Sequence, residues 1–250
     1  ESQLRANLQK MPPLETGRLW EKQITAIKNL EGSLAEARPR SLIQMATGSG
    51  KTFTACNIAL RLIKFGQAKR ILFLVDRNNL GRQTLNEFQQ FQSPYSSYKF
   101  TEEYGVQHLR KNAITDSSKV VITTIQRLYS ILKGEEDYEE ESEENSMFEA
   151  APVLIKEPMP VVYNEKLPPE FFSAIIVDEC HRSIYNVWRQ VLEYFDSLLI
   201  GLTATPSAQT IGFFNGNLVM EYPHEQAVVD GVNVGYDVYR IETEISKKGA

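Results

Sequence analysis

Short apolar runs alternate along most of the chain with segments of helical spacing. Runs of strand length, typical of strands buried on both faces, occur at 41–45, 71–75, 120–123, 172–177 and 198–202. Apolar residues three or four positions apart mark helices at 52–65, 80–88 and 125–132. This alternation predicts an α/β fold with a mostly parallel β-sheet and helices on both of its faces.

The pattern breaks between residues 134 and 169. Eight carboxylates fall within residues 135–144, and prolines follow at positions 152, 158, 160, 168 and 169. Because prolines and like charges both oppose a packed interior, we expect a surface insertion between a helix and a strand. Two interpretations of it stay open: a solvated loop without a task, and a contact with a partner subunit.

Two further patterns occur near the end of the chain. Asn215-Gly216 lies between apolar pairs, a turn signal typical of a β-hairpin. Alternating apolar residues over 235–245 predict a strand that leaves the domain. We therefore expect a helical segment at residues 1–35, one large domain at 36–235, and a strand or linker at 236–250.

Composition excludes several classes of protein. The 250 residues carry 42% hydrophobic residues, as is ordinary for a soluble globular protein, without an apolar stretch of about 18 residues to span a bilayer. The N-terminal segment is too polar for a secretory signal, so a cytoplasmic location is expected. Cys56 and Cys180 lie in apolar or motif-bearing segments, which predicts buried, reduced thiols.

The net charge of −5 does not exclude a nucleic-acid partner. Without the eight carboxylates of the acidic run, 27 basic residues face 32 − 8 = 24 acidic ones, so the rest of the chain carries about +3. The chain is therefore a mildly basic body with an acidic appendage.

A glycine-bearing loop between a predicted strand and a predicted helix has the context of a phosphate-binding loop. Its residues are Thr47, Gly48, Ser49, Gly50, Lys51 and Thr52. Glycines let backbone amides face phosphates, Lys51 has the reach for the β and γ phosphates, and Thr52 supplies a hydroxyl for Mg²⁺. The pattern departs from the usual one at its first position, where Met45 replaces glycine or alanine. These residues predict a nucleotide-binding fold and no particular task.

An acidic pair follows another predicted strand. Asp178 and Glu179 come directly after residues 174–177, and the carboxyl ends of parallel strands meet at one edge of a sheet. Asp178 is the candidate ligand for Mg²⁺, and Glu179 is the candidate base for the attacking water, with a further oxygen for the metal. His181 is placed to sense the bound phosphate, while a surface or capping histidine is the alternative. Cys180 is interpreted as a packing residue.

The motifs resemble those of a known group. In chain order, segments 46–52 (ATGSGKT), 178–181 (DECH) and 202–206 (LTATP) resemble motifs I, II and III of superfamily 2 helicases and translocases. The resemblance narrows to the R subunit of type I restriction enzymes over segments 178–185, 188–192, 201–206 and 227–234. It implies a RecA-like P-loop domain that binds ATP and Mg²⁺ and is the first motor lobe of a duplex DNA translocase.

The resemblance also implies roles for several polar residues. Thr203 and Thr205 would link the state of the nucleotide to domain movement. Arg77, Thr123 and Thr124 would lie on the face that tracks the DNA backbone, where hydroxyls and an arginine suit phosphate contacts. Alternatives remain open: Thr124 as the cap of the helix that begins at residue 125, and Arg77 as a solvated residue at a helix start.

A candidate adenine site lies upstream. Gln23 resembles the glutamine that recognises adenine in this group, although Lys22 stands where an aromatic residue is frequent. Trp20 is the alternative stacking surface. A helix with Trp20 on its buried face and Gln23 outside is the competing structural interpretation.

Other parts of such an enzyme are absent from this sequence. No Glu-x-Lys pair of the kind found in nuclease domains occurs, and neither does a second RecA-like lobe. The expected partners are therefore duplex DNA, that second lobe, a nuclease domain of the same subunit, and the methylation and specificity subunits. The alternative functions are a strand-separating helicase lobe for DNA or RNA, and an ATP-gated scaffold without turnover.

Overall fold

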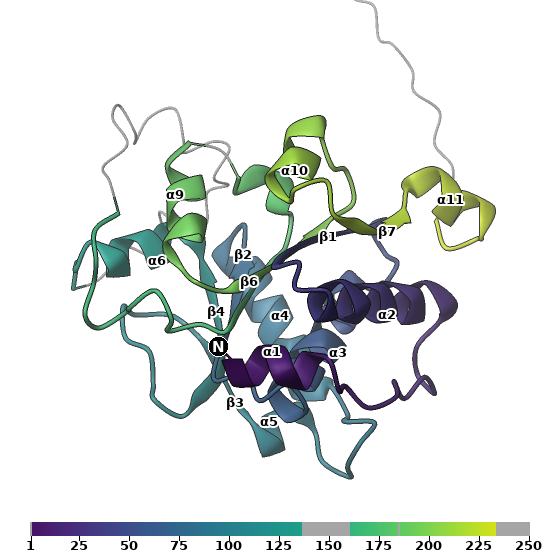
Figure 1. Ribbon diagram of the computed structural model, residues 1–250, viewed down its shortest axis with the longest axis horizontal. Coiled ribbons are helices and arrows are strands. Elements are labelled where there is room, and N and C mark those ends of the chain that lie inside the picture. The colour runs from purple at the N-terminus through teal and green to yellow at the C-terminus, as the bar shows by residue number, and fades with distance from the viewer. Residues whose placement is uncertain (1, 137–160, 185, 234–250) are drawn as a thin grey trace, which may run out of the picture.

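Seven parallel strands form one sheet in the order β3-β4-β2-β5-β6-β1-β7 (Figure 1). The computed structural model describes residues 2–136, 161–184 and 186–233. The strands are β1 (Arg40–Met45), β2 (Ile71–Val75), β3 (Gly105–His108), β4 (Ser118–Thr124), β5 (Ala174–Val177), β6 (Leu198–Thr203) and β7 (Leu218–Tyr222). The five strands predicted from continuous apolar runs correspond to β1, β2, β4, β5 and β6. The predicted α/β fold with a parallel sheet is therefore confirmed.

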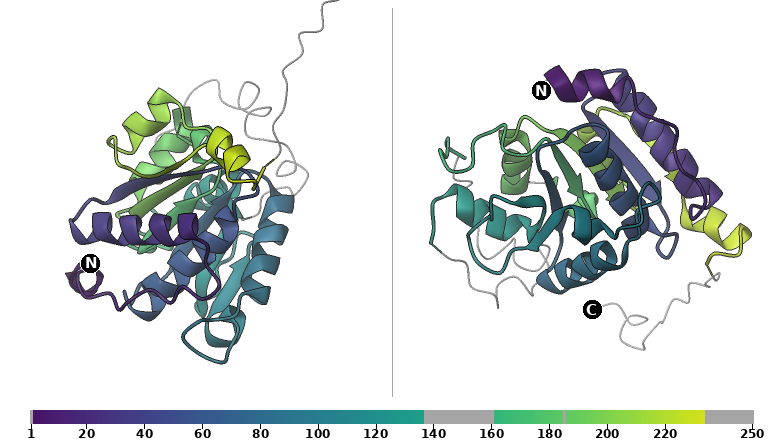
Figure 2. Two further views of the ribbon diagram at one scale, coloured as in Figure 1. Left: turned by 90° about the vertical axis from the view of Figure 1, so that its right-hand side faces the viewer. Right: turned by 90° about the horizontal axis from the view of Figure 1, so that it is seen from below.

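Helices cover both faces of this sheet (Figure 1, Figure 2). They are α1 (Ser2–Leu8), α2 (Glu21–Ala35), α3 (Lys51–Lys64), α4 (Asn78–Gln90), α5 (Phe100–Glu103), α6 (Ile125–Leu132), η1 (Cys180–Arg182), α9 (Asn186–Tyr194), α10 (Ala208–Phe213) and α11 (His224–Val229). The three predicted helices correspond to α3, α4 and α6. No helix among the described residues is long and apolar enough to cross a membrane.

The side chains of alternate residues in each central strand pack into two separate hydrophobic clusters, one on each face of the sheet. In β2, Phe73 packs in a cluster with α2, α3 and α4, whereas Leu72 and Leu74 pack in a cluster with α6, α9 and α10. Side chains alternate between the two faces of a strand, and burial on both faces explains why the strands are apolar throughout. Cys56 belongs to the first cluster and Cys180 to the second, and both are buried free thiols, as predicted.

The hairpin predicted around Asn215-Gly216 is wrong. Both residues have positive φ, 58° and 69°, as a tight turn requires, but the turn joins α10 to β7. Strand β7 then pairs in parallel with β1. A dipeptide with two left-handed residues reverses the chain after a helix as well as between two strands, so the local signal does not identify the partner strand.

The expected surface insertion is only partly described, because residues 137–160 lie outside the described ranges. Its described C-terminal part, 161–169, lies mostly at the surface, with Val162 and Tyr163 exposed, but it is anchored at two points. Leu167 is 1% exposed, and the Asn164 side chain donates hydrogen bonds to the carbonyls of Ile131 and Leu132 at the end of α6. A buried leucine and an amide that satisfies helix-end carbonyls thus hold this surface segment against α6. The strand predicted at 235–245 also lies outside the described residues.

A buried ion pair joins α2 to α3 and also holds the segment before α2. Arg61 of α3 is 1% exposed and forms a two-pronged pair with Glu31 of α2, with Nη2 2.9 Å from Oε2. The same guanidinium donates to the carbonyls of Pro12 and Pro13 and to the Tyr95 hydroxyl. Burial opposes the charge of Arg61, but the contacts with Glu31 and Tyr95 outweigh it and raise the pKa of the guanidinium.

Replacing Glu31 with glutamine tests this brace. Removing one partner of a buried pair leaves an uncompensated charge, so Glu31→Gln is expected to lower the free energy of unfolding by about 3 kcal/mol. The control is Glu36→Gln, since Glu36 and Arg38 form an exposed pair and such pairs contribute about 0–1 kcal/mol. Urea denaturation followed by circular dichroism measures both. A loss below about 1 kcal/mol for Glu31→Gln would show that the pair does not hold this segment.

Candidate functional site

The phosphate-type loop runs from the end of β1 to the start of α3. Gly48 and Gly50 have φ of 80° and 85°, a left-handed conformation that favours glycine. Thr47 and Gly48 are exposed, whereas Ser49 is buried and donates to the carbonyl of Ala46. The loop thus offers an open backbone cradle at the N-terminus of a 14-residue helix.

Met45 explains the departure from the usual loop pattern. It is the last residue of β1, pairs with Tyr222 of β7 and is fully buried in the first hydrophobic cluster. Its side chain therefore packs in the core and does not face the loop. The methionine at this position is thus a core residue of β1.

Gln23 and Trp20 hold this loop from below. Trp20 precedes α2, and its indole nitrogen donates to the Ser49 carbonyl at 3.1 Å. Gln23 is 4% exposed; its Nε2 donates to the Gly50 carbonyl at 3.2 Å, and its Oε1 accepts from the Trp20 amide at 3.3 Å. The alternative that placed Gln23 on the exposed face of the helix is therefore wrong. A side chain at Gly50 would collide with the Gln23 amide, at 2.4 Å, so this approach requires a glycine.

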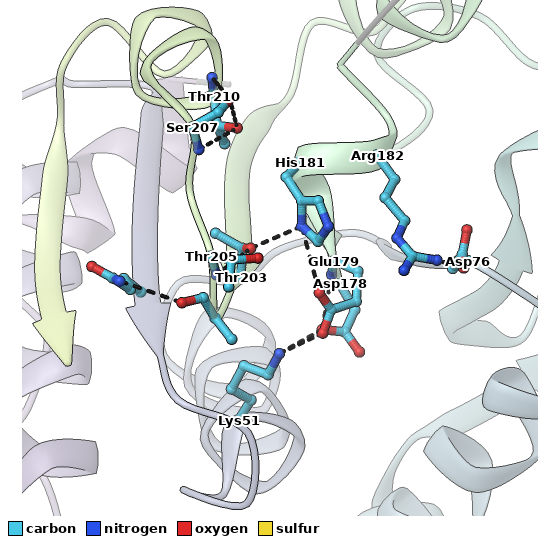
Figure 3. A network of polar contacts seen from close by, with 12 residues as sticks. Lys51, Asp76, Asp178, Glu179, His181, Arg182, Thr203, Thr205, Ser207 and Thr210 are labelled. Atoms are coloured by element: carbon cyan, nitrogen blue, oxygen red, sulfur yellow. Dashed lines mark hydrogen bonds and ion pairs between the residues drawn. The ribbon is translucent and has the colours of Figure 1, made fainter. Parts of the chain in front are cut away.

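Lys51 faces the acidic pair across the carboxyl edge of the sheet. Its Nζ lies 2.7 Å from Glu179 Oε1 and 3.9 Å from Asp178 Oδ1, and its side chain is 12% exposed (Figure 3). Lys51 begins α3 after β1, and the acids follow β5, with β6 between the two strands. The structure thus brings together the cation and the two carboxylates that the sequence placed 127 and 128 positions apart.

The backbone holds the acidic pair in a specific turn. The Asp178 amide donates to the Leu74 carbonyl of β2, which continues the pairing of β5 with β2. Glu179 has φ of 50°, an uncommon conformation for a residue with a side chain, and its amide donates to Asp178 Oδ1 at 3.0 Å. Burial raises the pKa of Asp178, a shift that Lys51 opposes and Glu179 reinforces.

His181 connects the acidic pair with β6. Its Nδ1 lies 2.9 Å from Thr203 Oγ1 and 3.5 Å from Glu179 Oε2 (Figure 3). Thr203 Oγ1 in turn accepts from the Thr205 amide at 3.1 Å. Burial lowers the pKa of His181, the nearby Glu179 opposes this shift, and Arg182 and Lys51 add to it. A chain of polar contacts therefore runs from Glu179 to the residues after β6.

The three residues expected to track DNA lie at the same edge of the sheet, beyond β2 and β4. Arg77 is the first residue before α4, and its side chain is 38% exposed. Thr124 caps α6, because its hydroxyl accepts from the Arg127 amide, as one of the two interpretations predicted. Thr123 and Thr124 are each 1% exposed. Among these three, only the arginine side chain is open to solvent in this arrangement.

Sequence reasoning missed two contributions to the site. Asn233 folds back after α11, and its side-chain amide donates to the Thr47 carbonyl at 2.9 Å. Arg182 pairs with Asp76 directly behind the acidic pair, at 2.7 Å. The signal for Asn233 was present, since segment 227–234 matched the resembled family, but a match of that kind names no partner. The pairing of Arg182 depends on the order of strands, which sequence spacing does not reveal.

Comparison with known proteins identifies the family. The model of the family described as type III restriction enzyme, res subunit, matches residues 16–208, and the chain belongs to this family. It is 30% identical over 234 residues to the endonuclease subunit of the type I restriction enzyme EcoKI of Escherichia coli K12, covering 86% of the chain and 17% of that subunit. It is 32% identical over 236 residues to the EcoAI endonuclease subunit of Escherichia coli, covering 91% of the chain and 24% of that subunit.

A solved structure agrees with these relatives. A fragment described as the HsdR subunit of a type I restriction enzyme from Vibrio vulnificus superposes with a TM-score of 0.57 at 25% identity, over 91% of this chain and 34% of that one. The resemblance to type I R subunits and the RecA-like, helicase-like fold are thus confirmed. The chain spans less than a quarter of the two Escherichia coli relatives, at 17% and 24% of their lengths.

The pairing of Lys51 with Glu179 predicts opposite effects of two substitutions on nucleotide binding. Lys51→Ala removes a charge-assisted contact worth about 1.5–3 kcal/mol, which is expected to raise the Kd for Mg-ATP about 10- to 150-fold. Glu179→Gln frees Lys51 from a competing carboxylate, so the Kd is expected to stay equal or fall. Isothermal titration calorimetry of both variants, with Glu193→Gln as an exposed control, measures the difference. Equal loss of binding in both variants would refute the separate roles.

Proposed function

We propose that this chain is the ATP-binding and hydrolysing motor lobe of a type I restriction enzyme R subunit and drives translocation along duplex DNA. The observation that carries the proposal is the arrangement of Lys51 opposite Asp178 and Glu179 beside an open, glycine-bearing loop. Phosphoryl transfer depends mainly on positioning and charge stabilisation, and this edge of the sheet supplies both. Membership of a restriction enzyme family supports the same assignment.

In this proposal the triphosphate of ATP enters the cradle and takes Lys51 from Glu179. The amides of the loop from Thr47 to Thr52 and the N-terminus of α3 favour the negative phosphates. Lys51 Nζ then pairs with the β and γ phosphates, because phosphate oxygens carry more charge than one carboxylate. The cation that now neutralises Glu179 thereby becomes the cation that neutralises the substrate.

Release from Lys51 leaves Glu179 as a carboxylate near the γ phosphate. It orients a water molecule whose oxygen attacks the γ phosphorus, while the bond from that phosphorus to the bridging oxygen of ADP breaks. The proton of the water passes to Glu179 and from there to the released phosphate. A positioned general base of this kind contributes about 10²–10⁴ in rate.

The residues of the site fit a magnesium ion. Mg²⁺ prefers oxygen ligands and is commonly held by one or two protein oxygens together with substrate phosphates and waters. Asp178 and Thr52 would supply such oxygens, with Glu179 as a further oxygen. The ion would neutralise charge on the transferring phosphoryl group.

The adenine contact is proposed for Gln23, with Trp20 beside it. Both side chains contact the carbonyls of the phosphate loop, so they lie at the base of the cradle. Since both ends of the Gln23 amide already bond to the backbone, adenine would compete for hydrogen bonds that now hold Gly50 and Trp20. Nucleotide binding would then be sensed through the loop itself.

Coupling and DNA contact are proposed for the remaining motif residues. His181, Thr203 and Thr205 form a continuous set of contacts from Glu179 to the end of β6, which suits the transmission of the nucleotide state. Arg77 is proposed to contact a DNA phosphate. Thr123 and Thr124 are proposed to join it through movement of the α6 start, since their hydroxyls are buried here.

The proposed partners are duplex DNA, a second RecA-like lobe and a nuclease domain of the same subunit, and the methylation and specificity subunits. The size of the relatives supports this, since the chain matches only 17% and 24% of their lengths. In such a motor the second lobe would supply an arginine on the opposite side of the nucleotide. An arginine of this kind accounts for about 10³–10⁵ in rate.

The rate of phosphate release tests the proposal at two lengths of polypeptide. This chain alone is expected to bind Mg-ATP yet release phosphate far more slowly than about 1 per second, an ordinary enzymatic rate. A polypeptide extended by the second lobe is expected to reach such rates only with linear duplex DNA. Turnover of about 1 per second by the chain alone, dependent on Glu179, would show that the site needs no second lobe.

A displacement assay with the extended polypeptide separates translocation from strand separation. Movement along intact duplex is expected to release a third strand bound in the major groove, without releasing either strand of the duplex. Efficient separation of a short duplex would instead favour the helicase alternative, and failure to release the third strand would contradict translocation.

A further inference from the structure

A second ion pair ties the acidic segment to the strand on its other side. Arg182, the last residue of η1, places Nη1 2.7 Å from Oδ2 of Asp76, which directly follows β2. Strands β2 and β5 are neighbours and pair Leu74 with Val177, so the ion pair joins their two carboxyl ends. Figure 3 shows the Arg182 side chain directed toward Asp76, on the side of the acidic pair away from Lys51.

Asp76 is shared between two arginines. Its side chain is 3% exposed, and the same Oδ2 that meets Arg182 lies 3.7 Å from Nε of Arg77. The side chains of Arg182 and Arg77 are 34% and 38% exposed, so each arginine contacts both the buried carboxylate and solvent. A buried carboxylate holds its partners more strongly than an exposed one, because water screens it less. Arg77 and Arg182 are therefore linked electrostatically although they belong to different elements.

Several buried polar atoms of α4, β4 and α6 lack hydrogen-bond partners among the described residues. They are Oδ1 of Asn78 at the start of α4, Oγ1 of Thr123 at the end of β4, and both amide atoms of Gln126 in α6. A buried polar atom without a partner costs about 1–3 kcal/mol. Such costs concentrate at segments that move between arrangements. Asn78 begins α4 after β2, and Thr123 lies at the end of β4, so the carboxyl edge of the sheet contains polar atoms without hydrogen bonds among the described residues.

We propose that Asp76 and Arg182 are positioning residues that couple phosphate contact at Arg77 to the hydrolytic side chain Glu179. An anion that draws Arg77 outward removes one of the cations that compete for Asp76 Oδ2, which tightens the pair of Asp76 with Arg182. Arg182 closes the turn that begins at Glu179, since its amide donates to the Glu179 carbonyl at 3.0 Å. Tightening this pair therefore fixes the turn from which the Glu179 side chain projects. This inference rests on the proposed function, because the anion is a DNA phosphate.

The coupling has a direction that the distances support. In the present arrangement Asp76 lies near both arginines, and Glu179 pairs with Lys51. Phosphate is a strong partner for a guanidinium, so DNA competes well with a carboxylate oxygen 3.7 Å away. Binding of duplex DNA at Arg77 thus favours the arrangement in which Arg182 pairs tightly with Asp76 and fixes the turn that begins at Glu179. By linkage, nucleotide that fixes this turn should also strengthen DNA binding.

The test is Arg182→Gln in the extended polypeptide, with the ratio of kcat with linear duplex to kcat without it as the readout. Allosteric coupling is commonly about 5- to 150-fold. Arg182→Gln is expected to reduce this ratio to about 2-fold or less, because the rate with DNA falls further than the rate without it. Asp76→Asn is expected to give the same loss, and the double variant no further loss, because both residues act through one contact.

Arg189→Gln is the matched control, since Arg189 is an exposed arginine that pairs with Glu193 within α9. It should keep the full stimulation. If Arg182→Gln also keeps it, the coupling is overturned and the proposed motor function stands. An equal fall of both rates would show a merely structural pair and would overturn the coupling as well. A wild-type protein without any DNA stimulation would overturn the proposed function together with this inference.

Discussion

The contact between Lys51 and the two carboxylates across the carboxyl edge of the sheet is the constraint on which the site depends. A single cation, 12% exposed, stands between carboxylates that repel one another and would be costly to bury alone. Only a parallel sheet brings the ends of β1, β5 and β6 to one edge with the helix N-terminus of α3 beside them. The ion pair is therefore consistent with the proposal that Lys51 exchanges these carboxylates for the more highly charged triphosphate of ATP.

The helices on the α2 and α3 face of the sheet support the glycine-bearing loop. Gln23 and Trp20 contact the loop carbonyls from α2, and α2 is fastened to α3 by the buried pair of Glu31 with Arg61. Arg61 also binds the backbone carbonyls of the two prolines ahead of α2, which fixes where the chain enters that helix. The contacts of Arg61 thus help to hold α2, and with it Gln23 and Trp20, against the loop. Apolar packing of Met45 below the loop completes this support.

The sequence predicted the parts whose signal is local or periodic, and it failed where the partner is distant. Continuous apolar runs identified five strands, and the loop and acidic pair were found because each directly follows one of them. Strand β3 was missed, since it lies at the edge of the sheet and is only partly buried, which removes the apolar run. The turn at Asn215-Gly216 was recognised but its strand partner was not, because pairing of β7 with β1 depends on the whole topology. The same limit hid the contact of Arg182 with Asp76.

A structure of the chain with Mg²⁺ and a non-hydrolysable ATP analogue tests the central claim most directly. The account predicts that Lys51 Nζ leaves Glu179 Oε1 and lies within about 3 Å of β and γ phosphate oxygens. It also predicts that the amides between Thr47 and Thr52 surround the phosphates, and that Glu179 faces the γ phosphorus. A nucleotide bound elsewhere, with the contact between Lys51 and Glu179 intact at its present 2.7 Å, would contradict the account.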